Sequence, residues 1–164
     1  QCIEWGNGVN ELIAWMVHGA APFPGAREAI QAMQEKVDTI VVSATPVDAL
    51  EREWNEHDLA KYMKVIAGQE MGSKAEHVRW GAKGKYADDK IMLIGDAPGD
   101  RDASFQEGVL FFPIKPGYER ESWAQFKDEA LGKFLDGTYR GAYQDRLVAE
   151  FEALLPEKPT WQTV

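Results

Sequence analysis

Two acidic side chains, four residues apart, follow the point where a buried strand is expected to end. The apolar run Ile91–Ile94 leads into Gly95, and Asp96 and Asp100 come directly after it. A short apolar run bounded by a glycine and proline turn is typical of a strand in a parallel α/β sheet. Such sheets bind ligands at the carboxyl ends of their strands, and paired carboxylates commonly hold a hard divalent cation. We therefore expect Asp96 and Asp100 to bind Mg²⁺.

These acids have two other possible interpretations. Asp100 could serve only to cap the helix that follows the strand. Asp96, Asp100, Asp102 and Glu107 also match the spacing of ligands in a calcium-binding loop. That loop is excluded because Arg101 occupies the position that requires glycine, and because a strand precedes it where a helix is needed.

The composition describes an ordinary soluble protein of one domain. The chain has 164 residues, of which 45% are hydrophobic and 27% are charged. Its net charge of -9 disfavours nucleic acids and anionic membranes as partners. A single cysteine, Cys2, rules out an intrachain disulfide, and the three histidines show no metal-ligand spacing, so we expect them to be surface or satisfied residues. No apolar run approaches the ~20 residues of a membrane helix, and no signal peptide is visible, so a cytoplasmic protein is expected.

Strand and helix patterns alternate along the chain. Strands are expected at Thr39–Ser43, Lys64–Ala67, Lys90–Ile94 and Val109–Phe112. Helices are expected at Val9–Val17, Ala26–Lys36, Asp48–Trp54, Lys74–Trp80, Arg101–Gln106 and, with breaks at Gly132 and Gly137, from Glu121 onward. This alternation predicts an α/β fold with a mainly parallel sheet, followed by an irregular tail at residues 156–164.

Three of the expected strand ends carry polar groups of complementary kinds. Ser43 and Ala44 follow the first strand, Lys74 begins the helix after the second, and Asp96 and Asp100 follow the third. In a parallel sheet these ends lie along one edge. A hydroxyl and backbone N–H groups there could bind phosphoryl oxygens, a lysine could neutralise them, and two acids could hold a metal ion. Taken singly, the serine is more often a cap and the lysine more often solvated.

In this order the motifs resemble those of the haloacid dehalogenase-like (HAD) hydrolase superfamily. Val41–Pro46 is similar to the second motif of the family, an apolar strand ending in Ser or Thr. Lys74 is similar to the third motif, and Gly95–Asp100 to the fourth. Pro22–Ile30 resembles the helical lead-in to the second motif. The resemblance extends over residues 22–114.

The resemblance implies a Rossmann-like, three-layer α/β/α core and a role for each matched residue. Ser43 and the backbone of Ala44 would bind a phosphoryl oxygen, and Lys74 would offset charge on the nucleophile and on the phosphoryl group. Asp96 would ligate Mg²⁺, and Asp100 would assist or orient that metal shell. The implied activity is a magnesium-dependent phosphomonoesterase that acts on a small phosphorylated substrate through an aspartyl-phosphate.

The first motif of the family, the Asp-x-Asp that supplies the nucleophile, is missing. No such pair follows an apolar strand before residue 39. The segment around Asp136 resembles the motif, but Phe134 occupies the position of its first Asp. Either the first strand and any cap domain lie in a segment outside this chain, or the chain is a non-catalytic module that binds phosphate or a partner. We favour the former, because a sheet without its central strand has an unpaired gap.

Under that hypothesis, residues 1–21 are a remnant of a cap domain or a linker helix, and residues 22–155 are the α/β core with its C-terminal helices. A nucleotide-binding or receiver-like α/β domain is a weaker alternative. Neither Gly-x-Gly-x-x-Gly nor the P-loop pattern occurs in the sequence.

Overall fold

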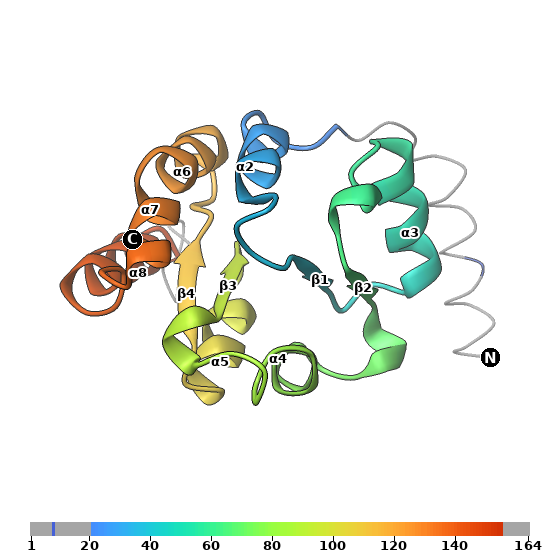
Figure 1. Ribbon diagram of the computed structural model, residues 1–164. Helices are drawn as coiled ribbons and strands as arrows, with labels where there is room; N and C mark the ends of the chain where they lie inside the picture. Colours follow the sequence, from blue (N-terminus) through green and yellow to red (C-terminus); the bar gives the residue numbers. More distant parts are fainter. Residues whose placement is uncertain (1–7, 9–20, 156–164) are drawn as a thin grey trace, which may run out of the picture.

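Short strands alternate with helices along the part of the chain that the computed structural model describes, which is Gly8 and residues 21–155 (Figure 1). The strands are β1 (Ile40–Val42), β2 (Val65–Ala67), β3 (Met92–Gly95) and β4 (Leu110–Pro113). The helices are α2 (Ala26–Met33), α3 (Val47–Glu56), α4 (Lys74–Gly81), α5 (Pro98–Gln106), α6 (Glu119–Gln125), α7 (Leu131–Asp136) and α8 (Ala142–Ala153). Shorter 3-10 turns occupy Ala60–Tyr62, Gln69–Met71 and Asp88–Lys90. The predicted helix at Val9–Val17, the proposed cap remnant apart from Gly8 and Ala21, and the tail after residue 155 lie outside the described residues.

The strands form two parallel pairs. β1 pairs with β2, Ile40 lying opposite Val65, and β3 pairs with β4, Met92 lying opposite Leu110. The α/β class and the parallel pairing predicted from the sequence are confirmed. Between the described strands no hydrogen bonds join the two pairs into one sheet, and Figure 1 shows β1 and β3 as the inner strands of the two pairs.

β4 is the most deeply buried strand because helices cover both of its faces. Side chains of successive strand residues point to opposite faces, so Phe111 and Phe112 enter different parts of the core. The Phe111 ring packs edge-on against Phe151 of α8, with 5.8 Å between ring centroids. The Phe112 ring packs against Phe126 on the other face, with 5.1 Å between centroids. These aromatic pairs anchor the C-terminal helices to the β3–β4 pair.

The edge of β4 that faces away from β3 is closed by side chains. The Phe111 N–H donates to the side-chain oxygen of Gln144 over 3.1 Å, and the Tyr139 hydroxyl donates to the Phe111 carbonyl over 2.7 Å. Both side chains are buried. Backbone groups of a strand edge are otherwise open to pairing with another chain, so these two residues end the sheet at β4.

The C-terminal helices differ from prediction at one glycine. The predicted break at Gly132 is wrong, because that residue lies inside α7, which a π-helical turn (Phe126–Ala130) precedes. The predicted break at Gly137 is confirmed. Its φ of 83° is left-handed, a conformation that glycine adopts without a side-chain clash, and α7 ends there. None of the helices in residues 21–155 combines the length and the apolar character that crossing a membrane requires.

Candidate functional site

The loop after β1 leaves two hydrogen-bond donors available. The Ser43 N–H donates to the Ala67 carbonyl over 3.0 Å and so extends the pairing of β1 with β2. The Ser43 hydroxyl oxygen accepts from the Thr45 N–H over 3.1 Å, which turns the chain away from the strand. Ala44 is exposed, and no described residue accepts from its N–H. The Ser43 hydroxyl proton and the Ala44 N–H can therefore both donate to a ligand.

A glycine after β2 lets that loop lie directly against the loop after β1. A Cβ atom on Gly68 would stand 2.6 Å from the Val47 nitrogen and 2.8 Å from the Thr45 carbonyl oxygen. The Gln69 N–H donates to the Thr45 carbonyl, and the Glu70 carboxylate accepts from the Val47 N–H. The sequence placed Gly68 only at a strand end, and its role in fixing this loop was missed.

Lys74 is the first residue of α4, and the start of that helix is firmly fixed. Ser73 precedes it as the N-cap, and its side-chain oxygen accepts from the Glu76 N–H. The Glu76 carboxylate in turn accepts from the Ser73 N–H over 2.8 Å. Hydrogen bonds from Ser73, first the backbone and then the side chain, lower the pKa of Glu76. This reciprocal capping box fixes the first turn of α4 and therefore the position from which the Lys74 side chain projects.

The structure brings Lys74 and Asp100 together. The Lys74 ammonium donates to one oxygen of the buried Asp100 carboxylate, and the Ala97 N–H donates to the other over 3.2 Å. A Cβ on Gly95 would lie 2.3 Å from the Asp100 carboxyl carbon, so the carboxylate occupies the space that a side chain at position 95 would need. Asp96, the other predicted metal ligand, is exposed. Asp100 therefore combines the helix-capping role with an ion pair.

A hollow of about 470 Å³ joins three of the segments identified from the sequence. It lies between the loop after β1, the start of α4 and one face of α5. Its lining residues are Ala44, Ser73, Lys74, Ala75, Gly99, Asp102, Ala103 and Gln106. The structure thus places Ala44 and Lys74 at one hollow, whereas Ser43, Asp96 and Asp100 are not part of its lining.

Residues 21–155, together with Gly8, contain no group of three or more His, Cys, Asp or Glu side chains arranged to hold a metal ion. Mg²⁺ commonly takes one or two protein carboxylates and completes its shell with water and substrate phosphates. The exposed Asp96 carboxylate suits that mode of binding. Asp100 is less suited to contact a metal ion directly, since Lys74 and Ala97 already occupy its two oxygens.

The histidine His77 was expected to be a surface or satisfied residue, and the structure shows otherwise. It is buried, and neither ring nitrogen has a hydrogen-bond partner among the described residues. It lies on the α4 face that also carries Lys74 and Gly81, and a Cβ on Gly81 would lie 3.1 Å from the Ile40 side chain of β1. The spacing of Lys74, His77 and Gly81, which places all three on one helix face, is the sequence signal that could have indicated the burial of His77.

Comparisons of the chain with protein-family models, curated proteins and solved structures found no match.

Proposed function

We propose that this chain is the phosphate-binding core of a magnesium-dependent phosphohydrolase of the HAD type, with a Rossmann-like, three-layer core. The observation that carries the proposal is the contact between Lys74 and Asp100 beside a hollow that Ala44 also lines. An ammonium, a carboxylate and an open backbone N–H, contributed by three strand-end segments, match the groups that the resemblance implies.

Each group of this chain has a defined task in the proposed reaction. The Ser43 hydroxyl and the Ala44 N–H donate hydrogen bonds to oxygens of the phosphoryl group. Lys74 offsets the negative charge of that group, and its contact with Asp100 keeps the ammonium at the site. Donors fixed before the substrate arrives stabilise charge without reorganising, and this is usually a large part of catalysis.

Asp96 is the residue that would hold Mg²⁺ in this proposal, with Asp100 orienting the shell around it. The metal ion would supply positive charge that, together with Lys74, offsets the charge of the phosphoryl group. A single exposed carboxylate suits an ion that keeps most of its water ligands and is bound largely through the substrate.

The nucleophilic Asp would come from a strand outside the described residues, in a segment that this sequence does not contain. The arrangement of β1 and β3 supports this part of the proposal. They are the inner strands of two parallel pairs, and neither pairs with a described strand on its inner side. A parallel strand between them would satisfy both inner edges and join the pairs into one sheet.

A specific observation favours a second candidate, a non-catalytic HAD-like module that binds phosphate or a partner. Both oxygens of Asp100 are satisfied by Lys74 and Ala97, as in a structural ion pair. On this alternative the site binds an anion through Lys74 and the loop after β1 and performs no chemistry.

Phosphate binding by the chain itself tests what both candidates share. Inorganic phosphate is titrated in the presence of Mg²⁺ and followed by the ³¹P signal, for the native chain and for Lys74→Met and Ser43→Ala. Lys90→Met is the matched control, because Lys90 precedes β3, at the opposite end of the strand from Asp96, and donates to the Leu135 carbonyl. We expect saturable binding that is weakened about tenfold or more by Lys74→Met and unchanged by Lys90→Met.

Binding that Lys74→Met leaves unaltered would overturn both candidates. Hydrolysis separates them. A polypeptide that also contains the proposed nucleophile strand should release phosphate from a generic phosphate ester only when Mg²⁺ is present. Phosphate binding without any such release would refute the enzyme and leave the binding module.

A further inference from the structure

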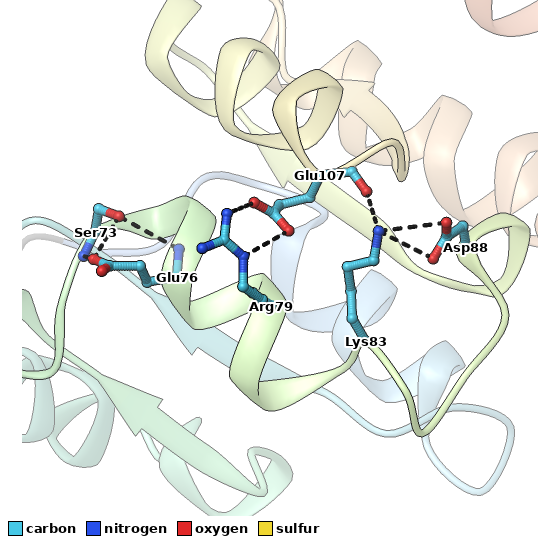
Figure 2. Close-up of polar contacts among 6 residues, drawn as sticks. All are labelled: Ser73, Glu76, Arg79, Lys83, Asp88 and Glu107. Carbon is cyan, nitrogen blue, oxygen red and sulfur yellow. Dashed lines mark hydrogen bonds and ion pairs between the residues drawn. The ribbon is translucent and has the colours of Figure 1, made fainter.

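A second set of polar contacts joins α4 and the residues just after it to the end of α5, beyond the Lys74 contact (Figure 2). Arg79 of α4 reaches Glu107, the residue at which α5 ends, through two N–H groups. The Nη2–Oε1 distance is 2.6 Å and the Nε–Oε2 distance is 3.3 Å. The Glu107 side chain is only 5% exposed, against 51% for Arg79. The hydrogen bond with Glu107 raises the pKa of Arg79, so the guanidinium keeps its positive charge.

Lys83 holds the same end of α5. Its ammonium donates to the Glu107 backbone carbonyl over 2.6 Å and pairs with Asp88 at 3.3 Å. Carbonyl groups at a helix C-terminus lack intrahelical partners, and a nearby cation satisfies them and complements the helix dipole. Two cations from α4 and the residues just after it therefore fix the end of α5 (Figure 2).

The two helices are thus joined at two levels. Lys74 and Asp100 connect their first turns, whereas Arg79 and Glu107 connect them further along. A helix rises about 1.5 Å per residue. Sliding α4 along α5 by a single residue would therefore change the distance between the charged groups in both pairs. Both contacts can form together in one register of the helices.

Apolar packing alone leaves this register weakly specified. The buried apolar residues on the two helices are small: Ala75 and Val78 on α4, and Ala103 on α5. Small side chains form shallow ridges, which interlock less than large ones do. The two-point contact of a guanidinium with a carboxylate, in contrast, fixes direction as well as distance.

We propose that Arg79 and Glu107 are positioning residues, which set the register of α4 against α5 and so keep the Lys74 ammonium on Asp100. The importance of that position for binding phosphate rests on the proposed function. The inference about the register does not, and can be tested separately.

The test follows the Lys74 ammonium directly by NMR in the native chain and in Arg79→Lys and Arg79→Gln. Arg79→Lys keeps a positive charge beside Glu107 but loses the two-point contact, so it separates positioning from simple charge pairing. If Arg79 positions Lys74, both variants should exchange the Lys74 ammonium protons with water about fivefold faster, the scale of losing one hydrogen bond. They should also weaken the nuclear Overhauser contact between Lys74 and the Asp100 methylene group.

Arg146 of α8 provides the matched control. Its side chain is 52% exposed and pairs at 3.1 Å with Glu150 of the same helix rather than with a residue of α4 or α5. Arg146→Lys and Arg146→Gln should leave the Lys74 ammonium signal unchanged. Urea unfolding of all variants shows how much each change affects stability in general.

A native-like Lys74 signal in folded Arg79→Lys and Arg79→Gln would overturn the inference, even if both variants were less stable. Should Arg79→Gln fail to fold, Arg79→Lys decides, since it retains a cation beside the buried carboxylate. Inorganic phosphate added with Mg²⁺ to the native chain then tests the other proposal. If phosphate leaves the Lys74 signal unperturbed while Arg79→Lys alters it, the proposed function fails and the register inference stands.

Discussion

Replacing Gly95 by alanine should be among the most damaging small changes in this protein. The added Cβ would lie 2.3 Å from the Asp100 carboxyl carbon, 2.4 Å from its Cβ and 2.5 Å from one carboxylate oxygen. Asp100 is buried and belongs to the first turn of α5, so it cannot simply rotate into solvent. The carboxylate must therefore leave the Lys74 ammonium and the Ala97 N–H.

The size of the effect follows from those lost contacts. Breaking a buried ion pair costs about 3–5 kcal/mol, and hydrogen bonds to charged groups contribute about 1.5–3 kcal/mol. Lys74 is 26% exposed and regains some hydration, so we expect Gly95→Ala to lower the free energy of unfolding by about 3–4 kcal/mol. At about 2–4 °C per kcal/mol for a chain of this length, Tm should fall by roughly 6–16 °C.

A double-mutant cycle in urea isolates the proposed clash. Asp100→Gly is the suitable second change, because alanine at position 100 would keep the Cβ that lies 2.4 Å away. Gly95→Ala should then cost less than about 1 kcal/mol in the Asp100→Gly background. Gly132→Ala is the control: no atom lies within 4 Å of its added Cβ, and the change should stabilise α7 by about 0.5–1 kcal/mol. An equal cost of Gly95→Ala in both backgrounds would refute the reasoning.

Three further predictions concern the C-terminal half. Tyr139→Phe should lower the free energy of urea unfolding by about 1–2 kcal/mol, because the buried Phe111 carbonyl loses its donor; an unchanged value would contradict the closed edge of β4. The hydrogen bond from Lys115 lowers the pKa of Glu150 below its ordinary 4.5. The stability that this contact contributes is therefore present above pH 4.5 and is lost as pH falls through the lowered pKa. Glu150→Gln should flatten that part of the pH–stability curve. Burial raises the pKa of Tyr143 from 10.0 to about 12, so stability should fall as pH rises through that interval. Tyr143→Phe should make this fall shallower but not abolish it, because burial raises the pKa of Tyr139 as well.

Local sequence patterns predicted most of the strands and helices of the α/β part. Each of the four predicted strands is present within two residues of its expected bounds, because short β-branched and aromatic runs between turn residues favour extended structure. The boundary of α5 was less well predicted. The helix begins at Pro98 rather than Arg101, since proline suits the first helical position.

The chemistry of the candidate site was only partly visible in the sequence. The types of Ser43, Lys74 and Asp100, and their places after strands, indicated groups that could bind phosphate. Their spacing in the sequence could not show that Lys74 pairs with Asp100, nor that both Asp100 oxygens would be satisfied. Such pairing depends on how α4 packs against α5, which local patterns do not encode.

The sequence alone therefore determined the order of strands and helices and which polar groups follow each strand, because these depend on neighbours within a few residues. Only the tertiary structure decided which of those groups touch. The contact of Lys74 with Asp100, the contact of Arg79 with Glu107 and the burial of His77 all depend on elements that are distant along the chain. Long-range packing sets those distances, and at this site a few ångströms separate an ion pair from two unrelated charges.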